Sequence, residues 1–292
     1  MLRKLLKNKF DFVLVINKTK QILSEVNMSD LLFSDNLHIS AMVQIGKLNT
    51  QVELGKLANS LETNDNILYI EHGQQVNKGH NNKKFSKKKT ASRKYFYNQV
   101  TIHIFNSEKA NKRVNVKVFN NGTIQMTGVN SHEIGEYTAK TIIEEFNKLS
   151  LDIKTDIFDH ETVQQVGSLE TVLINSDFDI HNEINREKLH RLIILNGYMS
   201  SFEPCTYPGV NIKYYHNPLR QNYGICDCEK PCDGKGKNNT CKKITVAVFK
   251  SGKIIITGGR SKHNIQTAYE FITEFIEENR TEILKKETVQ PS

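Results

Sequence analysis

The chain has 292 residues, with 40 Lys and Arg against 32 Asp and Glu and a formal net charge of +8. This length suits two ordinary domains or one domain of two similar halves, and the positive charge favours a polyanionic partner. No run approaches the roughly 20 apolar residues that span a bilayer, and the apolar run at residues 12–16 is too short for a secretory signal, so we expect an intracellular protein.

The N-terminal part, residues 1–36, is a basic amphipathic extension whose structure the pattern does not decide. The first half follows at residues 37–150. Hydrophobic periodicity there predicts a helix at residues 52–61 and a second helix capped by Ser131. Alternating apolar residues predict strands at residues 39–48, 66–72, 97–105, 114–119 and 123–128.

A strongly basic insertion interrupts this half at about residues 73–96. It has almost nothing to bury, which predicts a mobile loop. Three interpretations stay open for its positive charge: a solvated surface, contacts with phosphates, and a localisation signal.

The second half, residues 160–287, follows a polar connector at residues 151–159. It repeats the order strand, helix, strands, helix, with strands at residues 163–174 and 210–215, a strand pair at residues 246–258, and helices at residues 186–195 and after Ser261. Both closing helices carry an apolar stripe that can cover one face of a sheet. The order predicts an α+β fold with helices on one face of an antiparallel sheet.

An internal duplication links the two halves. At a constant offset of 130 residues, matching positions carry the same residue types through a strand, a turn, a second strand and a helix cap. The matched residues are Phe119, Gly122, Ile124, Thr127, Gly128 and Ser131 in the first copy, and Phe249, Gly252, Ile254, Thr257, Gly258 and Ser261 in the second.

Both faces of the strand pair at residues 246–258 are uncharged. Even positions such as Val246 and Ile254 fall on one face, and Ala247, Phe249, Ile255 and Thr257 fall on the other. The closing helix covers one face only. The other face therefore needs a second partner.

Four of the five cysteines lie in a Gly- and Lys-rich insertion at about residues 217–242. Cys226, Cys228, Cys232 and Cys241 have the spacing C-x-C-x3-C-x8-C. Four thiolates in a tetrahedron bind Zn²⁺ and order a loop that has no core of its own, which would make the metal structural. The alternative is a mobile loop with reduced thiols.

These features together resemble the TATA-box-binding protein family. The likeness rests on the two copies of the strand-turn-strand unit, the segment F-E-P-C-T-Y-P-G at residues 202–209 and the closing helices, and it covers roughly residues 37–287. The insertions are similar to those of TATA-binding-protein-like factors from large DNA viruses. The resemblance implies two tandem repeats forming a saddle, whose curved antiparallel sheet places its concave face on the DNA minor groove and its helices on the convex side.

The resemblance also implies roles for individual residues. Phe119 and Phe249 match aromatic residues that wedge a base step, with Tyr97 and Tyr207 as their respective partners. Gln44 and Thr171 match a pair of Asn residues that donate to base acceptors, Lys213 matches an Arg that contacts phosphate, and His103 takes the equivalent place in the first half. The remaining residues expected on the DNA-facing side are Gln125, Thr127, Ala247, Ile255, Thr257 and Lys117, of which Lys117 replaces an aliphatic residue.

By the same resemblance, Glu203 matches a residue that contacts a transcription factor IIB-like protein, while Cys205 replaces a second acidic residue. We therefore expect a non-enzymatic transcription initiation factor that bends AT-rich promoter DNA and recruits other initiation factors and RNA polymerase. It would act in the nucleus or, for a viral protein, in a viral factory in the host cytoplasm or in the virion. The alternatives are an architectural or partner-binding protein without TATA preference and a nucleic-acid-holding subunit of an enzyme.

Overall fold

A computed structural model describes residues 36–79, 95–106, 112–220, 223–230, 232–237 and 240–284. The fold below is that of the compact unit that begins at His38. The expected N-terminal extension, except Asn36, lies outside the described residues, as do residues 80–94 of the basic insertion.

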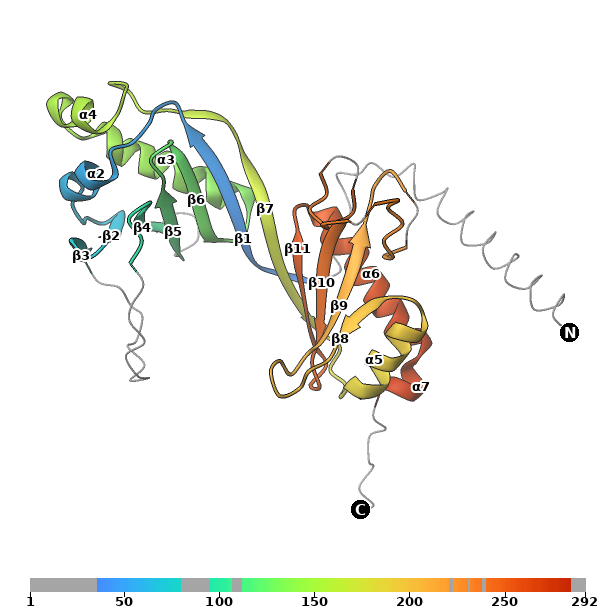
Figure 1. Cartoon of the computed structure of the whole chain (residues 1–292). Coiled ribbons are helices and arrows are strands. Elements are labelled where there is room, and N and C mark those ends of the chain that lie inside the picture. Colours follow the sequence, from blue (N-terminus) through green and yellow to red (C-terminus); the bar gives the residue numbers. More distant parts are fainter. Residues whose placement is uncertain are drawn as a thin grey trace, which may run out of the picture. The chain divides into compact units, whose positions relative to one another are not determined.

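One antiparallel sheet of eleven strands forms the body of this unit, in the order β3-β2-β4-β5-β6-β1-β7-β11-β10-β9-β8 (Figure 1). The first half supplies β1 (His38–Leu48), β2 (Ile67–His72), β3 (Val76–Gly79), β4 (Val100–Asn106), β5 (Lys112–Val118) and β6 (Thr123–Val129). The second half supplies β7 (Gln165–Asp179), β8 (Met199–Ser201), β9 (Val210–His216), β10 (Lys242–Val248) and β11 (Lys253–Gly259). β1 pairs with β7, which joins the two halves, and the sheet is curved and unclosed.

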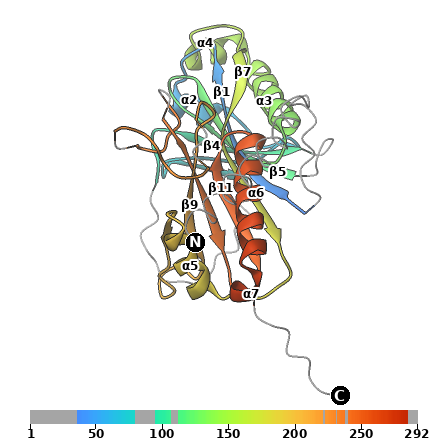
Figure 2. The same cartoon turned by 90° about the vertical axis from the view of Figure 1, so that its right-hand side faces the viewer.

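The helices are α2 (Leu54–Ser60), α3 (His132–Asn147), α4 (Leu151–Ile157), α5 (Arg186–Leu195), α6 (Lys262–Glu278) and α7 (Arg280–Ile283). α3 packs against β4, β6 and β7, and α6 packs against β7, β9, β10 and β11, as Figure 2 shows for α6 over β11. α2 and α5 cover the outer strands of their own halves. This arrangement confirms the α+β fold. Among the described helices, none is long and apolar enough to cross a membrane.

Sequence parity explains which face each helix covers. Val114, Val116 and Val118 of β5 are fully buried, as are Ile254 and Ile256 of β11, while the odd positions between them are half-exposed or exposed. Burying these branched apolar side chains under α3 and α6 is the main stabilising contribution to the fold.

The residues that both copies of the internal repeat share lie where strands end and where helices begin. The Oγ atoms of Ser131 and Ser261 accept hydrogen bonds from the backbone N–H groups of Ile134 and Asn264, which caps α3 and α6. Gly122 turns β5 into β6 at φ +76°, and a Cβ there would lie 2.0 Å from the carbonyl oxygen of Thr50. Only glycine fits this position.

The strand β8 lies outside the predicted strands, and β7 runs on to Asp179, past its predicted end at residue 174. Two further segments differ from their sequence-based prediction. Residues 76–79, expected in a mobile loop, form the edge strand β3, because the Lys78 ammonium donates to the carbonyl oxygens of Asn59 and Leu61 and to Glu62. The connector at residues 151–159 contains the helix α4, which packs against α2 and buries Ile157. Short polar segments conceal such elements because tertiary contacts, not local pattern, stabilise them.

Candidate nucleic-acid interface

The sheet face opposite the helices, called the open face below, carries most of the expected site residues. Gln125 and Thr127 of β6 and Ile255 and Thr257 of β11 lie on it and are half-buried. Ala247 of β10 lies opposite Ile255 of β11 and is only 3% exposed. These positions give the face small, amide and branched side chains.

The Phe249 ring ends this face in the second half. Tyr207 lies against it with ring centroids 5.7 Å apart in an edge-on arrangement. A Cβ on Gly209 would lie 2.9 Å from the Tyr207 ring and 3.3 Å from the Phe249 ring, so this glycine lets the two rings approach. Edge-on aromatic pairs contribute about 0.5–1.5 kcal/mol beyond their burial.

Arg186 of α5 holds the loop that carries Tyr207. Its guanidinium donates to the carbonyl oxygen of Pro208, and its Cζ lies 5.1 Å from the centroid of the Phe202 ring. Because Arg186 comes from a packed helix, it fixes the loop on which Tyr207 lies against Phe249.

The first half places its aromatic residues differently. Phe119 directly follows β5 and is half-buried, and its backbone closes the turn to β6 through hydrogen bonds with Thr123 and Gly122. Tyr97 is 58% exposed and lies edge-on to His72, with ring centroids 6.3 Å apart, above Gly73. Tyr97 and Tyr207 nevertheless occupy the same place, three residues before β4 and β9 respectively.

Gln44 and Thr171 lie on the helix-covered face, which departs from the expectation that they contact base edges. Gln44 is fully buried, and its amide nitrogen lies 3.2 Å from His132 Nδ1 at the start of α3 and 3.3 Å from Thr171 Oγ1. The physical reason is register: the β1–β7 pairing shifts between Val43 and Gln44, so Thr171 shares the helix side with Gln44.

The two residues expected to meet phosphate occupy matching places. His103 on β4 lies opposite Asn115 with its Nε2 3.1 Å from the Asn115 amide nitrogen, and Lys213 on β9 lies opposite Thr245 and donates to its Oγ1 at 3.0 Å. Burial, and then the neighbouring Lys243, lowers the pKa of Lys213. A phosphate beside this ammonium would relieve that electrostatic penalty.

Sequence reasoning missed the contribution of β7 to the open face. Asn175 accepts a hydrogen bond from Thr257, and the Asp177 carboxylate lies 3.3 Å from the Lys253 ammonium. The signal was available, because Asn175 and Asp177 alternate with the buried Ile174, Ser176 and Phe178.

Glu203 lies in the loop between β8 and β9, away from the sheet pairing. Its side chain is exposed, and its carbonyl oxygen accepts from the N–H groups of Thr206 and Tyr207. Cys205 in the same turn is also exposed. The loop is thus ordered by its backbone and leaves both side chains free to meet a partner.

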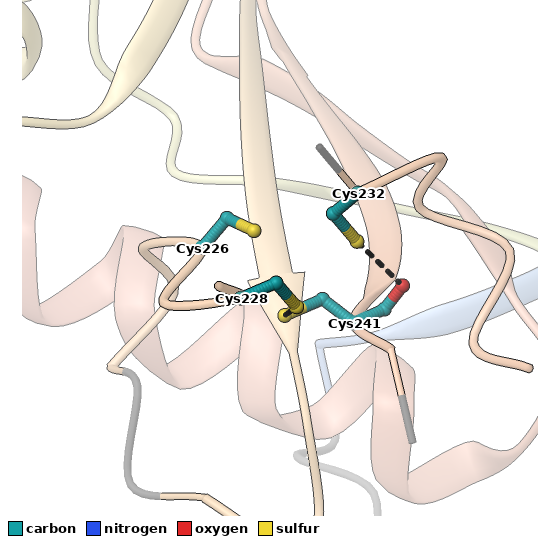
Figure 3. Close-up of side chains that lie close together, drawn as sticks. All are labelled: Cys226, Cys228, Cys232 and Cys241. Atoms are coloured by element: carbon teal, nitrogen blue, oxygen red, sulfur yellow. Dashed lines mark hydrogen bonds between the residues drawn. The ribbon is translucent and has the colours of Figure 1, made fainter. Parts of the chain in front are cut away.

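The four clustered cysteines lie close together in the inserted loop between the end of β9 and the start of β10 (Figure 3). Their Sγ atoms all lie within 4.8 Å of one another, and those of Cys228 and Cys241 are 3.6 Å apart. Cys241 directly precedes β10, and the N–H of Lys243 donates to the carbonyl oxygen of Gly234, which ties the inserted loop to the sheet. The cluster can hold a metal ion.

Electrostatics within the cluster shift the pKa values of its thiols in different directions. Burial raises the pKa of Cys241 to about 12, and hydrogen bonds from the Cys241 backbone and thiol lower the pKa of Cys228. A metal ion would reverse the penalty at Cys241, because metal-bound thiols are deprotonated.

Comparisons with known proteins give three similarities. Residues 174–279 match the family model described as transcription factor TFIID, or TATA-binding protein. A TATA-box-binding protein-like protein of Acanthamoeba polyphaga mimivirus is 28% identical over 280 residues, covering 88% of this chain and 71% of the relative. Among solved structures, Methanococcus jannaschii TBP matches with a TM-score of 0.48 and 18% identity, over 83% of this chain and 99% of that one. The matched family is one of transcription factors rather than enzymes, and the chain is similar over most of its length to a TATA-box-binding protein-like protein of a giant virus.

Proposed function

We propose that this protein is a transcription initiation factor that binds AT-rich promoter DNA through the minor groove and bends it. The observation that carries the proposal is the open face itself. It is a broad face of mostly uncharged side chains that none of the described helices covers, and Phe119 and Phe249 end it at equivalent strand ends of the two repeats. A broad, mostly uncharged sheet face of this kind marks an interaction site.

A widened minor groove supplies the matching surface. Insertion of Phe119 and Phe249 between base pairs would unstack one step at each end of the site, at a cost of a few kcal/mol. Burial of the open face against the bent duplex offsets that cost. Pyrimidine–purine steps such as TA unstack most readily, so AT-rich sites are favoured through deformability as well as through contacts.

The direct contacts fall into two groups. Gln125 and Thr127 supply groups that hydrogen-bond to the base acceptors on the groove floor, where A·T and T·A pairs look nearly alike. Thr257 meets the groove from the second half, with its hydroxyl donating to Asn175. Lys213 and His103 lie farther out along the sheet and contact phosphates. Gln44 and Thr171 support the sheet from beneath α3 and orient β1 and β7.

The cysteine cluster is proposed to bind one structural Zn²⁺. A tetrahedron with Zn–S bonds of about 2.3 Å has sulfur–sulfur edges of about 3.8 Å, and the sulfur positions need only small adjustments to reach it. The metal would supply cross-links that order the inserted loop. Cys226, Cys228, Cys232 and Cys241 would hold it as thiolates.

Protein partners are proposed to dock on the loop that carries Glu203. This carboxylate is exposed and held on the turn next to the Tyr207–Phe249 pair, so a transcription factor IIB-like protein there would contact the end of the bent DNA site as well. Recruitment of RNA polymerase would follow from that contact. The protein would act where its genome is transcribed: in the nucleus or, if viral, in a cytoplasmic viral factory or the virion.

The test is a competition among three duplexes of equal length, made of A·T pairs, of inosine·cytosine pairs and of G·C pairs. Inosine·cytosine keeps the minor-groove pattern of A·T but changes the major groove. Minor-groove binding predicts similar affinity for the first two duplexes and about tenfold or more weaker binding to the third. Equal binding to all three, with a steep salt dependence, would instead identify an architectural protein held by phosphate contacts.

A further inference from the structure

One row of side chains makes the two halves of the open face chemically unequal. In the first half, Thr101, Lys117 and Gln125 lie side by side across β4, β5 and β6. In the second half, the matching row is Asn211, Ala247 and Ile255 across β9, β10 and β11. The internal repeat thus has an ammonium and an amide in one copy where it has two apolar side chains in the other.

Lys117 and Gln125 are available for a ligand. Both are half-buried on the open face, and within the described parts of the chain neither head group forms a hydrogen bond or ion pair with another described residue. In the second half, Asp177 lies opposite Ile255 across β7 and β11, and its carboxylate is already paired with Lys253 at 3.3 Å.

The minor groove offers one feature that this row can distinguish. A G·C pair presents two acceptors and the guanine N2 amino group, whereas an A·T pair presents acceptors only. An amide both accepts and donates, and an ammonium group only donates. Gln125 can therefore accept from guanine N2 while Lys117 donates to the adjacent acceptors. Ala247 and Ile255 would bury that amino group without a partner, which is unfavourable.

We propose that Lys117 and Gln125 make the first half of the open face tolerant of a G·C pair, whereas Ala247 and Ile255 restrict the second half to A·T pairs. This inference rests on the proposed binding of the minor groove. It gives the protein a preferred orientation on an asymmetric site, with its first half over the G·C-containing end.

The test uses the full chain and an A·T duplex in which one G·C pair is moved stepwise through one half of the site. The wild-type protein should lose less than about threefold in affinity, because it can place its first half over the substituted end. The Lys117→Ala/Gln125→Ile variant should lose about tenfold or more for the same duplex. Each protein is compared with its own affinity for the A·T duplex, and Lys140→Ala on α3, an exposed lysine, controls for lost charge.

Two further measurements isolate the effect of the guanine N2 amino group. Wild type should bind a duplex with G·C pairs in both halves about tenfold more weakly, and replacing one guanine by inosine, which lacks N2, should restore binding. Ile255→Gln should gain tolerance of G·C in both halves. If wild type binds the A·T duplex but these ratios are the same in every variant, the inference is overturned and the proposed function stands. If no duplex is bound, both fail.

Discussion

The two repeats place different residues at the same buried position of their closing helices. Glu145 of α3 is 5% exposed and accepts hydrogen bonds from Asn64 and Asn66 at 2.8 Å and from Lys148 at 2.6 Å. Phe275, 130 residues later in α6, packs instead against the rings of Tyr198 and Phe271. A polar network and an aromatic cluster thus fill one place in the fold, because the place requires satisfied contacts and not a particular side chain.

The same contrast extends to the loops and the open face. Between β9 and β10 the second half inserts the cysteine cluster, and its open face carries Ala247 and Ile255 where the first half carries Lys117 and Gln125. The two repeats therefore share their turns, their helix caps and the positions of Phe119 and Phe249. They differ in the side chains that fix the closing helices and in those that line the open face.

The cysteine cluster should give the largest effect. Structural zinc contributes about 10–16 kcal/mol in zinc-finger peptides, so removing it should unfold the inserted loop. We expect one zinc per chain, and we expect a chelator or Cys241→Ser to speed hydrogen exchange at residues 223–243 while the first-half strands stay protected. Cys205→Ser, outside the cluster, is the control. A protein without metal, with the same exchange before and after zinc addition, would refute the site.

The aromatic cluster around Phe275 in the second half should give the next largest effect. Phe275→Ala removes a ring that is 7% exposed, and such truncations cost about 3–5 kcal/mol. Urea unfolding should show this loss at every pH tested, since no ionisable group at that position changes. A loss below 1 kcal/mol would mean that the stability of α6 does not depend on the aromatic cluster around Phe275.

The hydrogen-bond network of Glu145 in the first half should contribute less to stability, and its contribution should depend on pH. Burial alone would raise the pKa of Glu145, but hydrogen bonds from Lys148, Asn66 and Asn64 outweigh it and lower the pKa below its ordinary value of 4.5. The stabilisation is therefore fully present above pH 4.5 and is lost as the pH falls through the lowered pKa. Glu145→Gln should cost about 1.5–3 kcal/mol at neutral pH, and its difference from wild type should shrink in acid. A pH-independent difference would contradict this account.

The smallest effect should come from Asp177, whose position on the open face is matched in the first half by the uncharged Ile45. Asp177→Asn removes a negative charge facing DNA and releases Lys253, so affinity for an A·T duplex should rise about two- to fivefold at low salt. The gain should fade as salt is added. Weaker binding by this variant would mean that DNA does not bind against Asp177 on the open face.

Much of the fold followed from local signals. The 130-residue offset, the caps Ser131 and Ser261 and the parity of β5, β6, β10 and β11 predicted which face the helices cover. The bounds of α5 also matched the predicted residues 186–195. These features depend on residues near one another in sequence, so pattern alone reveals them.

Register across the centre of the sheet did not follow from pattern. The β1–β7 ladder shifts at three points, and each shift changes which side chains share a face. Gln44 shares the parity of the buried Met42 and Leu48, a signal obscured because a polar residue is unusual in a core. β3 and α4 were missed because distant contacts stabilise them.

The central claim is that the open face bends DNA by inserting aromatic side chains at its two ends. The direct measurement is energy transfer between the ends of a short TA-rich duplex with wild type and with Phe119→Ala/Phe249→Ala. The account predicts a large rise in transfer with wild type, and binding with little rise for the variant. Equal transfer with both proteins, or binding by wild type without any rise, would contradict it.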